Sequence, residues 1–288
     1  MFFKNFKVWE TEFAGRKLSV ETGKMAGLAN ASVMVRYGDT NVLCTVTASA
    51  KPREGVDFFP LSVDYEEKMY SVGRIPGSFQ RREGRASEKA ILTSRCIDRP
   101  IRPLFPKDLR NNCSVVATVM SVDPDCSPEI AAMIGVSTAI AISDIPWDGP
   151  ISGVNVGLVD GEIVLNPTLE QRAKTDLNLT VASTADLVAM IEAGGNEISD
   201  DLMFDCIMAG HEENKKIVKF IQGIVDEIGK PKFAYESSDP DPDIMKEIED
   251  FCIEDVKKAL DTDDKLVRDE ALLPIYEAVH EKFDERFE

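Results

Sequence analysis

The sequence predicts an α+β fold followed by a small all-helical domain. Two observations support this class. Short runs rich in β-branched and aromatic residues recur through residues 17–194, with few helical segments between them. After residue 243, apolar residues instead recur at helical spacing. Strands that outnumber a few packed helices indicate α+β rather than a regular alternation of strand and helix.

Each predicted strand is a short apolar or β-branched run, and turn residues separate the runs. In chain order the runs are KLSVETG (17–23), ASVMVRY (31–37), NVLCTVTAS (41–49), FFPLSVDYEE (58–67), CSVVATVMSV (113–122), ISGVNVGLV (151–159), GEIVLNP (161–167), DLNLTVAST (176–184) and ADLVAMIEAG (185–194). The run at 41–49 is dense in β-branched residues. Asp160 and Gly161 carry the Asp-Gly signature of a tight hairpin between two of these runs.

Three helices are predicted among these strands. The first begins near Ser87, which is a suitable N-cap. The second, PEIAAMIGVSTAIAIS (128–143), has Ser127 as N-cap and Pro128 at its first position. Its small and apolar residues on all sides imply burial between layers. The third, EENKKIVKFIQGIVDEIG (212–229), ends at its final glycine, as helices commonly do.

The chain changes composition at YESSDPDPD (235–243), a stretch typical of a linker. From Glu236 to Glu288 there are 19 acidic and 7 basic residues, so this part carries most of the formal net charge of −18. The segments IMKEIEDFCIEDVKKAL (244–260) and LVRDEALLPIYEAVHEKFDERF (266–287) have helical spacing, and the second is expected to kink or start again at Pro274. We therefore expect a larger domain over 1–235 and an all-helical domain, truncated at its end, over 236–288.

Composition limits the class of protein. A chain of 288 residues with 43% hydrophobic content can bury a large core, and no apolar run approaches the length needed to span a bilayer. The N-terminal segment MFFKNFKVWETEF carries charges among its aromatic residues and lacks the features of a signal peptide. The six cysteines are scattered without a CxxC pair, as free thiols of a reducing compartment are, and two histidines argue against a zinc site. These features predict a soluble cytoplasmic protein.

The segment from Arg74 to Arg110 opposes the charge of the rest of the chain. It contains ten basic and four acidic residues, a local balance of +6 in an acidic protein. Arginine dominates it, and the planar guanidinium matches phosphate geometry better than the point charge of lysine does. Phe79 stands two residues before Arg81 and could supply a stacking face for a base. The first hypothesis is therefore a site for a nucleic-acid backbone.

The candidate RNA-contacting residues are Phe79, Arg81, Arg82, Arg85, Arg95, Arg99 and Arg102. The first four lie in GSFQRREGR (77–85), whose glycines are typical of a surface loop. The last three are spaced i, i+4 and i+7, so they share one helix face if the helix continues past Pro100. In a competing interpretation the arginines pair with acidic neighbours and Phe79 is a core residue.

Long segments of this chain resemble the polynucleotide phosphorylase family of bacteria. They are GRKLSVETGKMAGLANASVMVRYGDTNVLCTVTAS (15–49), FFPLSVDYEEKMYSVGRIPGSF (58–79), IPGSFQRREGRASEKAILTSRCIDRPIRPLFP (75–106) and SDIPWDGPISGVNVGLVDGEIVLNP (143–167). The resemblance extends over essentially the whole chain. It implies a first ribonuclease-PH-like core domain of the ribosomal protein S5 domain 2-like fold, with mixed sheets and packed helices, followed by an all-helical linking domain.

The resemblance also implies an activity. Members of this family are phosphorolytic 3′→5′ exoribonucleases that use inorganic phosphate to release nucleoside diphosphates from RNA, and they also run in reverse as polymerases. Their subunits form a homotrimeric ring around a channel for single-stranded RNA, and RNA-degradation machinery is a further expected partner. By position, Phe79 matches the aromatic that stacks on incoming RNA, and Arg81, Arg82 and Arg85 match the arginines that grip its backbone. The three helix arginines match the segment behind that loop, whereas Gln80 replaces a more usual second aromatic.

In this family the phosphate and Mg²⁺ site lies mainly in a second ribonuclease-PH-like domain, which this chain lacks. The corresponding turn here, CSPE (126–129), places Glu129 where it would repel phosphate, and the corresponding strand offers Asn178 and Thr180 where an acid and a lysine are wanted. Asp123 and Asp176 remain, but without basic partners they make a poor site for Mg²⁺ and phosphate. We therefore expect no catalytic or metal-binding residue in this chain, and we expect it to bind RNA and help to build the ring.

Two other functions are alternatives. A non-catalytic, RNA-binding ring subunit of an exosome-like complex would share the fold and the arginines, although such subunits do not carry the helical linking domain. A small-molecule kinase of a related two-layer fold would need a glycine-rich phosphate loop that opens a helix. Neither GVNVGLVDG nor SPEIAAMIGVS provides such a loop.

Overall fold

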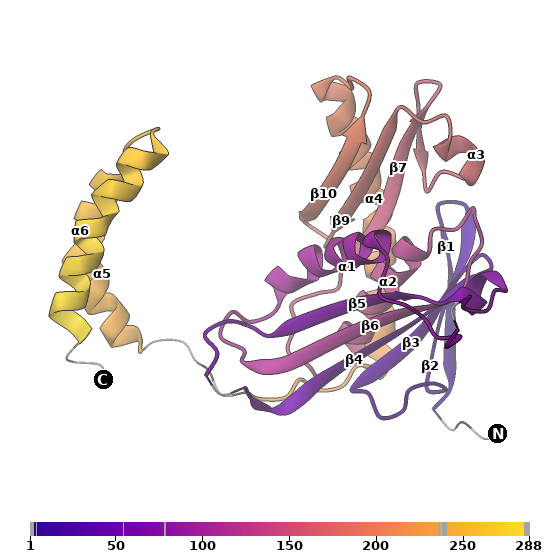
Figure 1. Ribbon diagram of the computed structural model, residues 1–288, viewed down its shortest axis with the longest axis horizontal. Helices are drawn as coiled ribbons and strands as arrows, with labels where there is room; N and C mark the ends of the chain where they lie inside the picture. The colour runs from indigo at the N-terminus through magenta and orange to yellow at the C-terminus, as the bar shows by residue number, and fades with distance from the viewer. Residues whose placement is uncertain are drawn as a thin grey trace. The chain divides into compact units, whose positions relative to one another are not determined.

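The computed structural model describes residues 3, 5–53, 55–77, 79–235, 237 and 241–284. The chain divides into two compact units, Met1–Glu236 and Ser237–Glu288. The first unit holds two β-sheets with packed helices (Figure 1). This architecture confirms the α+β class predicted from the sequence.

The larger sheet has six strands and is mixed. Its strands are β1 (Lys7–Phe13), β2 (Arg16–Thr22), β3 (Ala31–Tyr37), β4 (Thr40–Pro52), β5 (Leu61–Glu67) and β6 (Asn111–Ser121). They lie in the order β1-β2-β3-β4-β6-β5, with antiparallel pairing throughout except between β5 and β6. The parallel pair is possible because a long connection with a helix joins β5 to β6.

The smaller sheet has four antiparallel strands in the order β10-β9-β7-β8. They are β7 (Ser152–Val159), β8 (Glu162–Leu165), β9 (Leu177–Ser183) and β10 (Val188–Gly195). The hairpin between β7 and β8 turns at Asp160 and Gly161, whose φ angles are 52° and 82°. Two consecutive positive φ values are the requirement of a type I′ turn, so the predicted Asp-Gly hairpin is confirmed.

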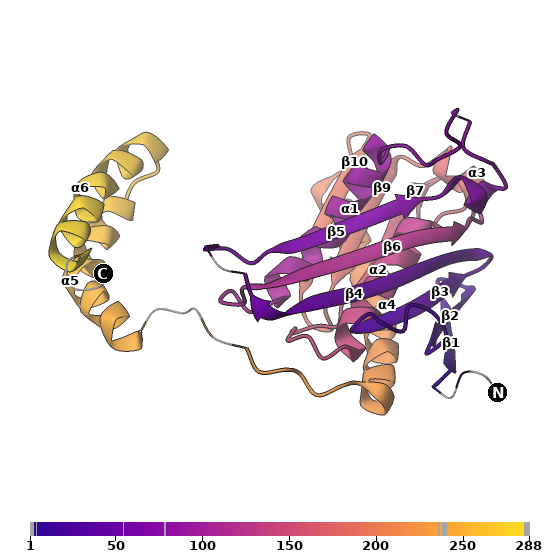
Figure 2. The same cartoon turned by 60° about the horizontal axis from the view of Figure 1, so that its bottom comes forward.

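The helices of the first unit are η1 (Met69–Val72), α1 (Glu88–Ile101), η2 (Arg102–Leu104), α2 (Pro128–Ile142), α3 (Leu169–Arg172) and α4 (Asp200–Ile228). Figure 2 shows β4, β5 and β6 in front of α1, α2 and α4, so these helices lie on one side of the six-stranded sheet. Within the described part of the chain, no α-helix covers the other side of that sheet, although the Tyr70 hydroxyl of η1 donates to Met120 Sδ on β6 at 3.2 Å. Apart from η1, that side is therefore an open surface of the first unit.

Helix α2 lies between the two sheets. It contacts β3, β4 and β6 of one sheet and β7 of the other, and nearly all of its residues are buried. At Gly135, a Cβ atom would stand 2.6 Å from Cys44 Sγ and 2.9 Å from Val35 Cγ2. Because that space is already filled, glycine is what allows α2 to pack directly on β3 and β4. The predicted burial of this helix between layers is confirmed.

The observed helix ends agree only in part with those predicted from the sequence. Ser87 is the N-cap of α1, and its side chain accepts the N–H of Ala90, as predicted. Ser127 precedes α2 as predicted, but its side chain makes no cap hydrogen bond. Helix α4 begins at Asp200, well before the predicted start at residue 212, and strand β1 was not predicted at all.

The second unit contains α5 (Pro242–Leu260) and α6 (Lys265–Phe283) in its described part. The side chains of Asp241 and Asp264 cap the two helices. Helix α6 continues through Pro274, so the interpretation that it starts again there is wrong. Residues 236 and 238–240 of the predicted linker lie outside the described residues.

All six cysteines are free thiols, and four of them are buried. Among the described residues, every helix is too short or too polar to cross a bilayer.

Candidate nucleic-acid interface

The arginine-rich segment forms an exposed loop over residues 74–86, between η1 and α1, here called the arginine loop. Three hydrogen bonds anchor it. The backbone N–H of Met69 donates to Glu83 Oε1 at 2.9 Å, and Ser87 Oγ donates to Glu67 Oε2 at 3.0 Å. Ser78 lies outside the described residues, and every residue from 79 to 89 is exposed. The Arg74 N–H donates to the Met69 carbonyl at 3.0 Å, so the loop is fixed at both ends while its arginines face solvent.

Phe79 is fully exposed rather than part of the core. Its relative exposure is 104%, whereas Phe105, which packs against Phe59 and Trp147, is 4% exposed. The interpretation of Phe79 as a core residue is therefore wrong. Covering an exposed ring with a flat apolar partner lowers the free energy of the system, and a nucleobase is such a partner.

Arg81, Arg82 and Arg85 are exposed, and none of them has an ion pair with another described residue. Arg82 and Arg85 line a groove of about 540 Å³ that Asp64, Glu66, Glu67 and Glu83 also line. Glu66 pairs with Lys68 at 2.7 Å, Glu67 accepts from Ser87, and Glu83 accepts from the Met69 N–H. The loop guanidinium groups are therefore open to an anion from outside the chain.

Helix α1 continues through Pro100 to Ile101, and Arg95, Arg99 and Arg102 are all exposed, but they differ in their partners. Arg95 is exposed and has no ion pair within the described part of the chain. Arg99 pairs with Glu192 on β10 at 2.7 Å. Arg102 lies in η2, where it pairs with Asp98 at 2.8 Å and donates to the Leu61 carbonyl on β5. Arg99 and Arg102 thus connect α1 to two different sheets. For these two residues, the competing interpretation holds, in which the arginines pair with acidic neighbours.

The N-terminus of α2 is occupied by a carboxylate of the chain itself. Glu129 Oε1 lies 2.7 Å from Lys89 Nζ, and Ser127 Oγ donates to Glu129 Oε2. Burial by itself raises the pKa of Glu129, but the hydrogen bonds from Lys89 and Ser127 outweigh burial and hold the pKa below its ordinary value. Since a helix N-terminus attracts anions, the ionised Glu129 fills the position that an outside phosphate would use.

A groove of about 430 Å³ opens beside Glu129, and Lys68, Lys89 and Arg172 contribute cations to its lining. Tyr65 also lines it, and the Tyr65 hydroxyl is buried without a hydrogen-bond partner among the described residues. Sequence reasoning did not single out Lys89, Tyr65 or Arg172. The chain brings them to α2 from three distant segments, and no local pattern links them.

The remaining acidic candidates do not fit a Mg²⁺ site. The N–H groups of Asp125 and Asp39 donate to the Asp123 carboxylate at 3.0 and 3.4 Å, and the hydrogen bond from Asp125 is the main cause that lowers the pKa of Asp123. Asp176 accepts from Asn196 Nδ2 at 3.4 Å. In the described residues, no group of three or more His, Cys, Asp or Glu side chains could hold a metal ion.

The predicted strand positions are engaged in the smaller sheet. Thr180 Oγ1 donates to Asn155 Oδ1 at 2.9 Å, and Thr180 lies opposite Glu192 in the pairing of β9 with β10. Asn178 is exposed and lies opposite Gly194. Neither position supplies a cation or a carboxylate of its own.

Known proteins similar to this chain belong to the 3′ exoribonuclease family. Residues 14–146 match the description "3′ exoribonuclease family, domain 1", and residues 149–213 match "3′ exoribonuclease family, domain 2". The chain is 57% identical over 282 residues to a polyribonucleotide nucleotidyltransferase of Ruminiclostridium cellulolyticum, covering 98% of this chain and 40% of the relative. It is 56% identical over 262 residues to the protein of that name from Clostridioides difficile, covering 91% of this chain and 37% of the relative.

The fold has a counterpart of low sequence identity among solved structures. The crystal structure of rice (Oryza sativa) Rrp46 superposes with a TM-score of 0.58 at 16% identity, covering 77% of this chain and 95% of that chain. This likeness concerns the fold alone. The chain spans about 40% of the length of the curated relatives that it matches. From these matches and the two-sheet architecture, the chain belongs to the 3′ exoribonuclease family, and its fold is ribonuclease-PH-like.

Proposed function

We propose that this chain is part of a polyribonucleotide nucleotidyltransferase, a phosphorolytic 3′→5′ exoribonuclease. Such an enzyme uses inorganic phosphate to release nucleoside diphosphates from single-stranded RNA and can run in reverse as a polymerase. The identity to relatives of that name over nearly the whole chain supports this proposal. Within the enzyme, this chain binds RNA and helps to build a homotrimeric ring, and a second ribonuclease-PH-like domain outside this chain carries the chemistry.

One observation carries the RNA-binding role. A fully exposed Phe79 stands beside Arg81, Arg82 and Arg85, which have no ion-pair partner among the described residues, in a protein of formal net charge −18. An aromatic ring beside unpaired guanidinium groups suits single-stranded RNA, because a base can stack on the ring and the phosphates can form ion pairs with the guanidinium groups. Arg95 extends this surface along α1. Arg99 and Arg102 are weaker contributors, because carboxylates already hold them.

The same enzyme requires Mg²⁺ and phosphate, and the residues of this chain do not fit that site. Glu129 fills the anion position at α2, and Asp123 and Asp176 lack the further ligands that a Mg²⁺ site needs. Lys68 and Lys89 line the groove that Asp123 also lines, but both already pair with carboxylates. We therefore assign both groups to the second ribonuclease-PH-like domain.

We further propose that residues 236–288 are the start of the helical domain that links the two ribonuclease-PH-like domains. The helices α5 and α6 and the high acidity of this unit support that assignment. Free cysteines are consistent with action in the reducing cytoplasm, where RNA-degradation machinery would be a partner.

The RNA-binding role is tested by replacing Arg81, Arg82 and Arg85 with Ala together. The affinity for a single-stranded oligoribonucleotide should fall without sequence preference. The slope of log K against log salt should become less steep by about 2, because each of the three lost phosphate contacts contributes about 0.7 to it. A matched control removes three cations that are already paired on the same unit: Lys7 with Glu227, Lys17 with Glu10 and Lys174 with Glu170. Equal slopes in the loop triple variant and the native chain would refute the role of the loop.

A further inference from the structure

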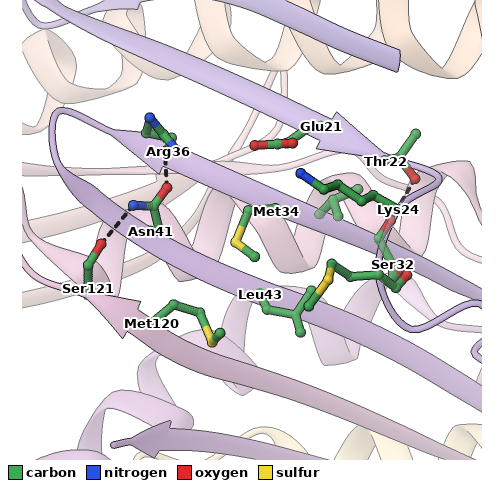
Figure 3. Close-up of a pocket in the computed structure, with 12 residues that line it drawn as sticks. Glu21, Thr22, Lys24, Ser32, Met34, Arg36, Asn41, Leu43, Met120 and Ser121 are labelled. Atoms are coloured by element: carbon green, nitrogen blue, oxygen red, sulfur yellow. Dashed lines mark hydrogen bonds between the residues drawn. The ribbon is translucent and has the colours of Figure 1, made fainter. Parts of the chain in front are cut away.

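A groove of about 300 Å³ lies on the uncovered face of the six-stranded sheet (Figure 3). Its floor consists of Met34 on β3, Leu43 on β4 and Met120 on β6, which are half-buried and lie on three adjacent strands. Strands are spaced about 4.8 Å apart, so the three side chains make a flat apolar floor about 10 Å wide. Thioether side chains adapt to a partner and contact aromatic rings favourably. A planar ring system matches such a floor.

One side of the groove holds an arginine in a fixed position. Ser121 Oγ donates to the Asp39 carbonyl at 2.7 Å, Asn41 Nδ2 donates to Ser121 Oγ at 2.7 Å, and Arg36 Nε donates to Asn41 Oδ1 at 2.9 Å. Figure 3 shows the part of this chain that runs from Arg36 through Asn41 to Ser121. The acceptor, Asn41 Oδ1, belongs to a neutral amide, so no carboxylate offsets the positive charge of Arg36. Its outer guanidinium nitrogens have no acceptor among the described residues.

The other side carries a second cation and a carboxylate. In Figure 3, the side chains of Lys24 and Glu21 extend toward the middle of the groove above Met34. Neither Lys24 nor Glu21 forms an ion pair with a described residue. The groove thus combines the open cation of Arg36, the Lys24 ammonium group, which lies 5.5 Å from the centroid of the Phe6 ring, one open carboxylate and a flat apolar floor. This is unlike Arg99 and Arg102, whose charges are neutralised by carboxylates.

We propose that this groove binds a ribonucleotide. The base lies on Met34, Leu43 and Met120, the phosphate is held by Arg36 on one side of the groove, and Lys24 lies on the other side. Arginine is suited to that role because its two outer nitrogens can contact two phosphate oxygens together. Glu21 accepts hydrogen bonds from the ribose hydroxyls, the role that an acidic residue has toward ribose in dinucleotide sites. The ligand is either a free nucleotide or one nucleotide of an RNA strand, and the recognition chemistry is the same.

The test uses this chain with its methionine methyl groups labelled with ¹³C and followed by NMR during titration with AMP. The Met34 and Met120 methyl signals should shift and saturate, while the signal of the core residue Met133, which is 1% exposed, should stay in place. Arg36→Gln should raise the Kd for AMP about tenfold or more, because a charged hydrogen-bonded contact to phosphate is lost. Lys17→Gln is the matched control, since Lys17 is on β2 and already pairs with Glu10.

Further ligands separate the possible occupants. Adenosine should shift the same signals at higher concentration, and inorganic phosphate alone should leave the floor methyl signals in place. If a single-stranded oligoribonucleotide without a terminal phosphate shifts them as well, the source includes RNA; if only AMP does, the source is a free nucleotide. No AMP-dependent shift, an unchanged Kd in Arg36→Gln, or shifts that depend on the concentration of the chain alone would overturn the proposal. The last result would make the groove a contact between two copies.

This proposal does not depend on the arginine loop. Replacing Arg81, Arg82 and Arg85 should leave the AMP titration unchanged, and Arg36→Gln should leave the stacking contribution of Phe79 unchanged. Failure of the nucleotide groove is therefore distinguishable from failure of the proposed RNA-binding loop.

Discussion

Phe79→Ala should weaken RNA binding and leave the stability of the fold unchanged. The Phe79 side chain is 104% exposed, so its removal uncovers no core surface, and the free energy of unfolding should stay within about 0.5 kcal/mol. Stacking of one base on an aromatic side chain contributes about 1–3 kcal/mol. The Kd for single-stranded RNA should therefore rise roughly 5- to 150-fold.

The assay combines fluorescence anisotropy with a labelled oligouridylate at constant low salt and urea denaturation of the same preparations. Phe105→Ala is the contrasting variant: Phe105 is 4% exposed, and its ring centroid lies 4.8 Å from that of Phe59. It should lose about 3–5 kcal/mol of stability, as large aromatic truncations in cores do. Phe79→Tyr keeps a ring and should keep the affinity. The reasoning fails if Phe79→Ala destabilises the fold as Phe105→Ala does, or if it binds RNA as tightly as the native chain.

Three further outcomes are expected. The chain incubated with single-stranded RNA, Mg²⁺ and inorganic phosphate should release no nucleoside diphosphate; sustained release that Asp123→Asn or Asp176→Asn abolishes would contradict this. Gly135→Ala should lower the free energy of unfolding in urea by about 1–3 kcal/mol, because the new Cβ would overlap Cys44 Sγ, and an unchanged midpoint would argue otherwise. Glu129→Gln should lower stability at neutral pH, and its difference from the native chain should shrink as the pH falls. A carboxyl whose folded-state pKa lies below the ordinary 4.5 stabilises the fold above that value and loses the contribution when acid protonates it, so parallel stability curves against pH would refute the pairing of Glu129.

Elements with a local physical cause could be predicted from the sequence. The Asp160–Gly161 turn needs two residues that tolerate positive φ, and the chain offers them side by side. Ser87 caps α1 through a hydrogen bond to a residue three positions away. Each predicted β-run overlaps an observed strand for the same reason, because alternation and β-branching act within a few residues.

Weak local patterns explain the missed elements. Strand β1 is an edge strand whose residues are exposed or half-buried except for the buried Phe13, so few of them show the apolar character of a strand. Helix α4 begins earlier than the apolar pattern predicts, because acidic residues in its first turns interrupt that pattern. Ser199 followed by Asp200 and Asp201 was a usable signal, since acidic residues favour the first turn of a helix.

Contacts between distant segments decide the candidate site, and those could not be predicted. Arg99 meets Glu192 only because α1 packs near β10, and Lys89 meets Glu129 only because α1 and α2 begin close together. The sequence treated all the arginines of the basic segment alike. The fold divides them into a pair held by carboxylates, Arg99 and Arg102, and a group without ion pairs, so the proposed RNA-binding surface includes fewer arginines than the sequence suggested.

The N-terminus of α2 and the arginine loop differ in what an incoming phosphate would meet. At α2, the phosphate would approach the ionised Glu129, and two like charges about 4 Å apart repel by about 4 kcal/mol at an effective dielectric constant of 20. It would also have to separate Lys89 from its partner. At the arginine loop, the guanidinium groups of Arg81, Arg82 and Arg85 have no partner to lose among the described residues. We therefore expect RNA to be held by the loop and not at α2. In the proposed function this chain binds RNA without accelerating its cleavage, because holding the ground state and the transition state equally leaves the chemical barrier unchanged.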